Sequence, residues 1–155
     1  MKNIGLYIAI LLCLLTISPA WADDLSRPGR GRIEQTVRII AKKHGIRPSH
    51  LLAIAEQESG FNAKAKGDWS EKQGRFRSWG MFQIQTRLHG VSKKQALDYK
   101  WAATWACRYL IKRGYRKNPE RGIRRYNGGG KPGSRGRIMS ERYRRDVLRK
   151  ARKYK

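Results

Sequence analysis

Cysteine, histidine and strand-like patterns are scarce in this sequence, and each scarcity excludes something. His44, His50 and His89 are far apart and lack the spacing of metal ligands, so we expect no metal site and no cofactor. Of the two cysteines, Cys13 lies in a segment that we expect to be removed, which excludes an internal disulfide. Cys107 lies in an apolar stretch and is expected to be a small buried residue. No run alternates apolar and polar residues convincingly and no repeat is found, so we expect a mainly α-helical domain.

The amino-terminal segment has the pattern of an export signal. Lys2 gives it a positive start, residues 4–17 form an uncharged apolar run, and Ala20 and Ala22 are small residues at the positions that a signal peptidase reads. We therefore expect residues 1–22 to be a cleaved signal peptide and the protein to act in the periplasm or cell envelope. The alternative is an uncleaved membrane anchor, for which the apolar run is shorter than the ~20 residues that span a bilayer.

Acidic residues are also scarce, and this imbalance restricts the partners. The chain has 36 Lys and Arg against 11 Asp and Glu, a formal net charge of +25; without residues 1–22 the counts are 35 and 11, or +24. Such a charge favours an anionic partner. Nucleic acid is the usual one, but the export signal argues against it, so we expect anionic envelope polymers and no nucleic acid. The densest basic stretch, residues 135–155, is either a solvated helix face or a binding surface.

The 133 residues that remain after cleavage (155 minus 22) are enough for one domain. Residues 23–31 contain Pro28 and two glycines among charged residues, which indicates a flexible lead-in to a domain over residues 32–155. Residues 62–79 show no period and are expected to form a loop. Apolar spacing and capping residues predict helices from about Arg32 to Gly45, from Pro48 to Gly60, over 81–88, from Ser92 through an apolar stripe at 101–110, from Asn118 to Gly128, and from Ser140 onward.

One acid within the second predicted helix has an unusual position. Leu51, Ile54, Ala55 and Glu58 recur at i, i+3, i+4 and i+7, which places the Glu58 carboxylate on the apolar face. Removal from water penalises the charged form of a carboxyl group and raises its pKa. A carboxylic acid that stays protonated near neutral pH is what cleavage of a glycosidic bond requires. Glu56 lies about 200° round the helix from Glu58 and is expected to face solvent.

Glu58 also lies in the first of three short motifs that follow one another along the chain. They are Q-E-S-G-F-N at residues 57–62, S-W-G-M-F-Q-I at 78–84 and Y-N-G-G at 126–129, with a weaker fourth, S-E-R-Y-R-R-D-V, at 140–147. Their order and residue types resemble the signature motifs of the soluble lytic transglycosylase family, E-S-x-F-N, G-L-M-Q-I, A-Y-N-A-G and E-T-x-x-Y-V. Goose-type lysozymes belong to the wider circle of this family. The resemblance covers roughly residues 33–148, and three motifs in order are far more specific than one.

The resemblance implies a lysozyme-like helical domain with a catalytic cleft that cleaves peptidoglycan. In this family one glutamate, here Glu58, protonates the oxygen between N-acetylmuramic acid and N-acetylglucosamine. It then deprotonates the muramoyl 6-hydroxyl, which attacks the anomeric carbon, and a 1,6-anhydro sugar forms without water. Matching positions imply that Ser59, Gln83, Tyr126 and Asn127 bind the glycan.

The sequence departs from the family pattern at several positions. Ala63 replaces the usual proline, Gly67 a serine, Phe82 a methionine and Arg125 an alanine. The stretch between Glu58 and Gly80 is also longer than usual, and it contains the only extra acids close to the first motif, Asp68 and Glu71.

Two other functions stay open. A hydrolytic lysozyme would use Asp68 or Glu71 to activate water, but a solvated loop rich in Lys, Arg and Gly is a poor holder for a second carboxylate. More remotely, the chain would be a basic protein that binds envelope polymers or nucleic acid, with Glu58 incidental.

The resemblance also implies partners. Small members of the family often open the wall locally for secretion, conjugation or pilus machines, which are therefore candidate partners. We expect the protein to be a monomer.

Overall fold

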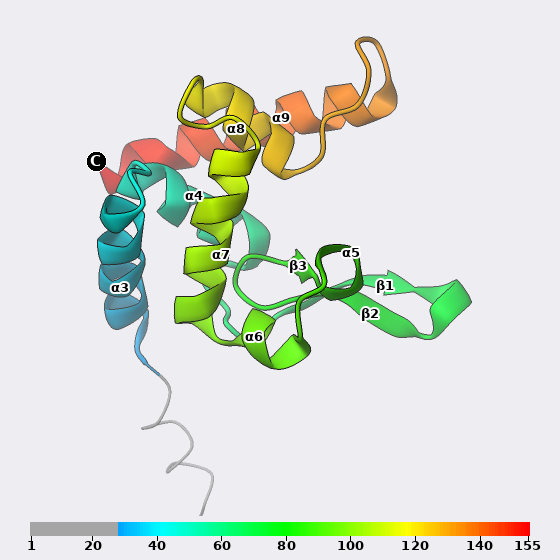
Figure 1. Ribbon diagram of the computed structural model, residues 1–155, viewed down its shortest axis with the longest axis horizontal. Helices are drawn as coiled ribbons and strands as arrows, with labels where there is room; N and C mark the ends of the chain where they lie inside the picture. Colours follow the sequence, from blue (N-terminus) through cyan, green and yellow to red (C-terminus); the bar gives the residue numbers. More distant parts are fainter. Residues whose placement is uncertain (1–27) are drawn as a thin grey trace, which may run out of the picture.

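The computed structural model describes residues 28–155 (Figure 1). The predicted signal peptide and residues 23–27 of the predicted lead-in lie outside the described residues. None of the helices within residues 28–155 has the length and hydrophobicity that spanning a lipid bilayer requires. This part is mainly helical, as the sequence predicted, and a small sheet lies to one side of the helices. The elements are α3 (Arg30–Lys43), α4 (Pro48–Ser59), β1 (Lys66–Ser70), η1 (Glu71–Gln73), β2 (Arg75–Trp79), β3 (Ile84–Gln85), α5 (Thr86–His89), α6 (Lys93–Leu97), α7 (Tyr99–Lys112), α8 (Pro119–Tyr126), α9 (Arg135–Ala151) and η2 (Arg152–Tyr154).

Helix α4 lies at the centre of the fold, where it packs against α3, α7 and α9. Pro48 suits its first turn, where a backbone N–H is not needed. Gly60 ends the helix with a left-handed φ of 61°, which glycine adopts without strain. Residues 51–55 are all fully buried, so α4 is enclosed on most sides rather than along one stripe. The predicted helix is confirmed, and its last turn holds Glu58 beside the sheet.

Residues 62–79, predicted as a loop, contain a β-hairpin, so that prediction was wrong. β1 and β2 pair antiparallel, with Trp69 opposite Phe76, and β3 pairs with the other edge of β2. Gly74, with a φ of 57°, lies in the turn between β1 and β2. Most of β1 is exposed, so no buried face imposes an alternation of apolar and polar residues that a sequence could display. The Trp69 and Phe76 rings pack edge to face, 4.9 Å apart, and stabilise the pair.

The helix predicted over residues 81–88 is also wrong, because the chain turns sharply there. A Cβ on Gly80 would lie 1.8 Å from the backbone oxygen of Ala96, and Gly80 has a φ of 75°, so only glycine fits. Gln83 also has a positive φ, 46°, which no helical residue adopts. The helix is therefore reduced to the single turn of α5.

The helix predicted from Ser92 is divided into α6 and α7. Ser92 and Gln95 form a capping box that starts α6. The Asp98 carboxylate then accepts hydrogen bonds from the backbone N–H groups of Lys100 and Trp101, at 2.9 and 3.2 Å, and starts α7. The second cap lies within the predicted helix and was not recognised as a boundary.

The start of the last helix differs from the prediction, whereas that of α8 agrees with it. Asn118 caps α8 as expected. Helix α9, however, is capped by Ser134, and Ser140 lies inside it, fully buried, with its hydroxyl donating to the Gly129 carbonyl at 3.1 Å. The first turns of α9 escaped detection because their apolar side chains, such as Ile138, are exposed and give no helical stripe.

The Glu56 carboxylate, which was predicted to face solvent, binds the C-terminal end of the chain instead. It accepts hydrogen bonds from the Lys153 ammonium at 3.0 Å and from the Tyr154 hydroxyl at 2.6 Å. Glu56 therefore ties α4 to η2, on a different side of the helix from Glu58.

Candidate active site

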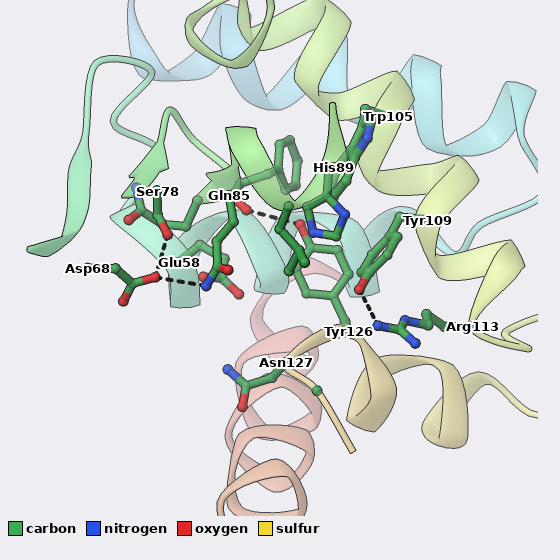
Figure 2. A pocket seen from close by; sticks show the side chains of 14 residues that line it. Glu58, Asp68, Ser78, Gln85, His89, Trp105, Tyr109, Arg113, Tyr126 and Asn127 are labelled. Atoms are coloured by element: carbon green, nitrogen blue, oxygen red, sulfur yellow. Dashed lines mark hydrogen bonds between the residues drawn. The ribbon is translucent and has the colours of Figure 1, made fainter. Parts of the chain in front are cut away.

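A cleft of about 470 Å³ lies among the last turn of α4, the sheet, α7 and the end of α8 (Figure 2). Of the five residues singled out from the sequence, Glu58, Gln83, Tyr126 and Asn127 line this cleft and Ser59 does not. The three motifs, which span residues 57–129, therefore meet around one cavity.

The Glu58 carboxyl group is surrounded mostly by protein at the edge of this cleft. Its Oε1 accepts a hydrogen bond from the Tyr143 hydroxyl at 2.5 Å. Burial raises the pKa of Glu58 to about 7; the hydrogen bond from Tyr143 opposes this rise and the negative charge of Asp68 adds to it. A carboxyl group with such a pKa is able to give up a proton and take one back near neutral pH.

Two tyrosines form a stacked pair beside Glu58. The Tyr126 and Tyr143 rings are nearly parallel, with centroids 6.4 Å apart, and the Tyr126 hydroxyl donates to the Phe82 carbonyl at 3.1 Å. Burial raises the pKa of both hydroxyl groups well above the ordinary value, and the charge of Glu58 adds to the effect. Both therefore remain protonated donors. Tyr143 was not singled out as a site residue, although the weak fourth motif contains it.

Ser59 connects α4 to the second motif. Its hydroxyl, which is partly buried, donates to the Met81 carbonyl at 2.9 Å. The Gln83 side chain lies across the same turn and donates to the Gly80 carbonyl at 2.9 Å. A Cβ on Gly67 would lie 2.0 Å from Gln83 Oε1, so the serine that the family pattern has here would displace the Gln83 amide. The departure at Gly67 therefore leaves room for Gln83.

The hairpin holds a second carboxylate in the cleft wall. Asp68 has a positive φ of 52°, and its Oδ2 accepts hydrogen bonds from the Ser78 hydroxyl and, at 3.1 Å, from Gln85 Nε2 (Figure 2). The expectation that a loop holds this carboxylate poorly is therefore wrong, because Asp68 lies in β1 and two side chains donate to it, although the residue stays exposed. Glu71 lies in η1 and does not line the cleft. The sequence indicates Asp68 only as part of the hydrolytic alternative, because its position in the cleft depends on the β1–β2 pairing, which local patterns do not predict.

The opposite wall is aromatic. Trp105 and Tyr109 stack at 4.8 Å with an angle of 14° between their planes, and His89 packs against both rings. Burial and the charges of Arg113 and Lys112 lower the pKa of His89, so it is neutral at physiological pH. Trp105 and Tyr109 belong to the apolar stripe predicted at 101–110, and each keeps part of its surface open to the cleft. Flat aromatic surfaces of this kind suit the apolar faces of sugar rings.

Residues 28–155 contain neither a cluster of metal ligands nor a reactive cysteine. No cluster of three or more His, Cys, Asp or Glu side chains in that range could hold a metal ion. Cys107 is fully buried, as predicted, and burial raises the pKa of its thiol to about 12, so it is not nucleophilic at physiological pH.

A comparison with known protein families finds a match that covers the cleft. A family profile described as "Transglycosylase SLT domain" matches residues 35–135, which include the first three motifs and every residue that lines the cleft. A search of curated proteins finds no match.

Proposed function

The chain belongs to the transglycosylase SLT family, and we propose that it is a peptidoglycan lytic transglycosylase whose catalytic residue is Glu58. The family has the lysozyme-like, mainly α-helical fold and acts on peptidoglycan in general. The observation that carries the assignment to Glu58 is its position in the cleft, with a pKa raised by burial to about 7. The other carboxyl group that lines the cleft, that of Asp68, belongs to an exposed residue of the hairpin.

In the proposed reaction Glu58 acts twice. As an acid it gives its proton to the oxygen that links N-acetylmuramic acid to N-acetylglucosamine, and the bond from that oxygen to the muramoyl anomeric carbon breaks. As a carboxylate it then takes the proton of the muramoyl 6-hydroxyl, whose oxygen bonds to the anomeric carbon. The product is a 1,6-anhydromuramoyl end, Glu58 regains its proton, and no water is consumed.

The surrounding residues have supporting roles in this proposal. Tyr143 orients the Glu58 carboxyl group and stabilises its charged form through a 2.5 Å hydrogen bond. Gln83 and Asn127 bind the glycan, and Tyr126 lines the cleft beside Glu58. Ser59, also expected to bind glycan, would act by holding the Met81 turn that carries Gln83.

A hydrolytic lysozyme is the second candidate, because Asp68 is held in the cleft wall by Ser78 and Gln85. Asp68 could direct a water molecule to the anomeric carbon, and the product would then have a free reducing end. Family membership favours transglycosylation. In that reaction Asp68 would raise the pKa of Glu58 and stabilise positive charge that develops on the sugar.

We also propose that the protein is exported and acts in the cell envelope. Residues 1–22 would direct the protein to the periplasm or cell envelope, where the peptidoglycan glycan strands lie. There it would act as a monomer, and a secretion, conjugation or pilus machine would supply the local context. The basic surface, part of a net charge of +24 without residues 1–22 (35 basic minus 11 acidic residues), would hold it near anionic envelope polymers.

The test of Glu58 is release of soluble muropeptides from purified sacculi. Glu58→Gln keeps the size of the side chain and an acceptor for Tyr143 but has no proton to transfer, so it should lower the rate to background. Glu71→Gln, which makes the same chemical change outside the cleft, is the matched control and should keep the wild-type rate. Substantial turnover by Glu58→Gln at equal protein concentration would remove the assignment.

A further inference from the structure

A second cavity of about 700 Å³ adjoins the cleft. Arg113 and Gly128 line both cavities, so the two lie side by side. Five cationic side chains surround the second cavity, from the end of α7, the end of α8 and the first turn of α9, and glycines 128–130 line the rest. The cations are Lys112, Arg113, Arg124, Arg125 and Arg137.

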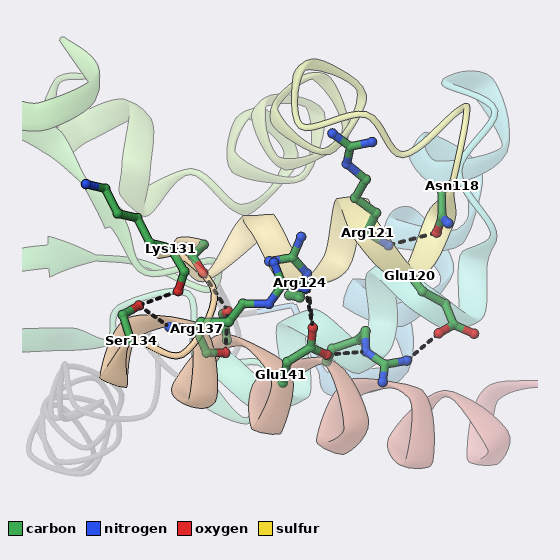
Figure 3. A network of polar contacts seen from close by, with 11 residues as sticks. Asn118, Glu120, Arg121, Arg124, Lys131, Ser134, Arg137 and Glu141 are labelled. Atoms are coloured by element: carbon green, nitrogen blue, oxygen red, sulfur yellow. Dashed lines mark hydrogen bonds and ion pairs between the residues drawn. The ribbon is translucent and has the colours of Figure 1, made fainter.

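These cations are poorly neutralised by the protein. Glu141 is the one carboxylate paired with any of them among the described residues; it lies 3.3 Å from Arg124 and 3.1 Å from Arg137 (Figure 3). It also pairs with Arg144, which further divides its charge. The other three cations, Lys112, Arg113 and Arg125, form no ion pair within residues 28–155.

Arg113, at the junction of the two cavities, has an unused donor. Its Nε is buried and has no hydrogen-bond partner in the described structure. A buried donor without a partner costs free energy, so the protein alone leaves the Arg113 guanidinium incompletely satisfied.

Helix dipoles explain why some of these cations lie where they do, but not why all five surround one cavity. Lys112, Arg124 and Arg125 lie in last turns, where the helix dipole favours cations. Arg137 lies in the first turn of α9, where the dipole disfavours a cation. Burial lowers the pKa of Arg124, and the charge of Arg137 lowers it further. Folding therefore gathers these like charges around the cavity against their mutual repulsion.

The glycine segment leaves backbone uncovered beside these cations. Gly128 and Gly130 have φ values of 131° and 67°, and a Cβ on Gly130 would lie 2.6 Å from the Arg137 backbone nitrogen. A side chain is thus excluded at Gly130 by lack of space and disfavoured at Gly128 by its φ. Arg125 stands where the motif of similar proteins usually has alanine, so this cation is a feature of this chain.

We propose that this cavity binds the carboxylates of the peptide stem carried by the glycan in the adjoining cleft. The inference rests on the proposed function, because only a peptidoglycan strand bound in the cleft would bring muramoyl residues, which carry the stems, beside this cavity. A planar carboxylate matches the paired N–H groups of a guanidinium group. Stem recognition would thus select peptidoglycan over stem-free glycan.

The test compares two substrates: peptidoglycan strands with intact stems, and the same strands stripped of stems by an amidase. Wild type should cleave intact strands with the lower KM. Arg125→Ala, which restores the family's residue, and Lys112→Gln, on the exposed rim, should each raise the KM for intact strands about fivefold, the size of one exposed ion pair. Neither should change the kinetics on stripped strands. Arg121→Gln, an exposed change on α8 outside the cavity, is the charge-matched control and should leave both KM values as they are.

The possible results separate this inference from the proposed function. Equal KM values of wild type for the two substrates, or equal effects of the cavity variants and Arg121→Gln, would overturn stem recognition while leaving the enzyme activity in place. Competitive inhibition by inorganic phosphate that Arg125→Ala abolishes, without any change in KM for intact strands, would reassign the cavity to a phosphate polymer. Failure of wild type to cleave either substrate would overturn the proposed function itself.

Discussion

Glu58→Gln is expected to remove activity but to stabilise the protein. The reason is that burial disfavours the charged form of the Glu58 carboxyl group, and glutamine carries no charge. The pKa of Glu58 is about 7 in the folded protein and near 4.5 when unperturbed. The folded state therefore binds this proton more tightly than the unfolded state does. The contribution of protonated Glu58 to the free energy of unfolding is therefore fully present below pH ~4.5. It is lost as the pH rises from there through ~7.

The size of the effect follows from the difference between these pKa values. A pKa difference of about 2.5 corresponds to about 3 kcal/mol once Glu58 is fully ionised in the folded state. The amide introduced by Glu58→Gln keeps the acceptor for Tyr143 and carries no charge, so the variant avoids this loss. It should resemble wild type near pH 4 and exceed it in free energy of unfolding by up to about 3 kcal/mol above pH 8.

The assay is urea unfolding of both proteins at a series of pH values from 4 to 9. The difference in free energy of unfolding should grow between pH ~4.5 and ~7 and then level off. Glu71→Gln, an exposed acid outside the cleft, should follow wild type throughout. A difference between wild type and Glu58→Gln that does not depend on pH would refute the claim that burial raises the pKa of Glu58.

Changes at three other positions, and a change of salt, have defined expected effects. Tyr143→Phe removes the hydrogen bond that lowers the pKa of Glu58, so the alkaline limb of the kcat/KM profile should move to higher pH; a move to lower pH would contradict this role. Asp68→Asn removes the charge that raises the pKa of Glu58, so the same limb should move to lower pH with most of kcat kept, whereas loss of activity would favour the hydrolytic alternative. Gly80→Ala should lower the free energy of unfolding by more than about 1 kcal/mol, because its Cβ meets the Ala96 oxygen; an unchanged urea midpoint would speak against that contact. Binding of Glu58→Gln to intact sacculi should weaken between low and high salt, since salt screens exposed charges, and unchanged sedimentation would assign the basic surface another purpose.

The helices could largely be predicted because each carries local signals for its start, face or end. Pro48 and Gly60 bound α4, and Asn118 starts α8. Where a helix lacked an apolar stripe, as in the first turns of α9, its start was placed too late. The hairpin was missed because its strands are mostly exposed and leave no alternation in the sequence.

Only those parts of the candidate site that a single sequence motif specifies could be predicted. The position of Glu58 on a buried helix follows from local spacing, so the sequence indicated it. The contact between Glu58 and Tyr143 joins residues 85 positions apart and depends on how α9 crosses α4. The place of Asp68 depends on strand pairing. Tertiary packing decides both, and local sequence patterns do not encode it.

The most direct test of the central claim is the mass of the muropeptides that wild type releases from purified peptidoglycan in water labelled with heavy oxygen. Attack by the muramoyl 6-hydroxyl consumes no water, so the account predicts 1,6-anhydromuramoyl ends without label as the main product, and none from Glu58→Gln. Reducing ends that carry heavy oxygen as the dominant product would contradict it and identify a lysozyme that activates water.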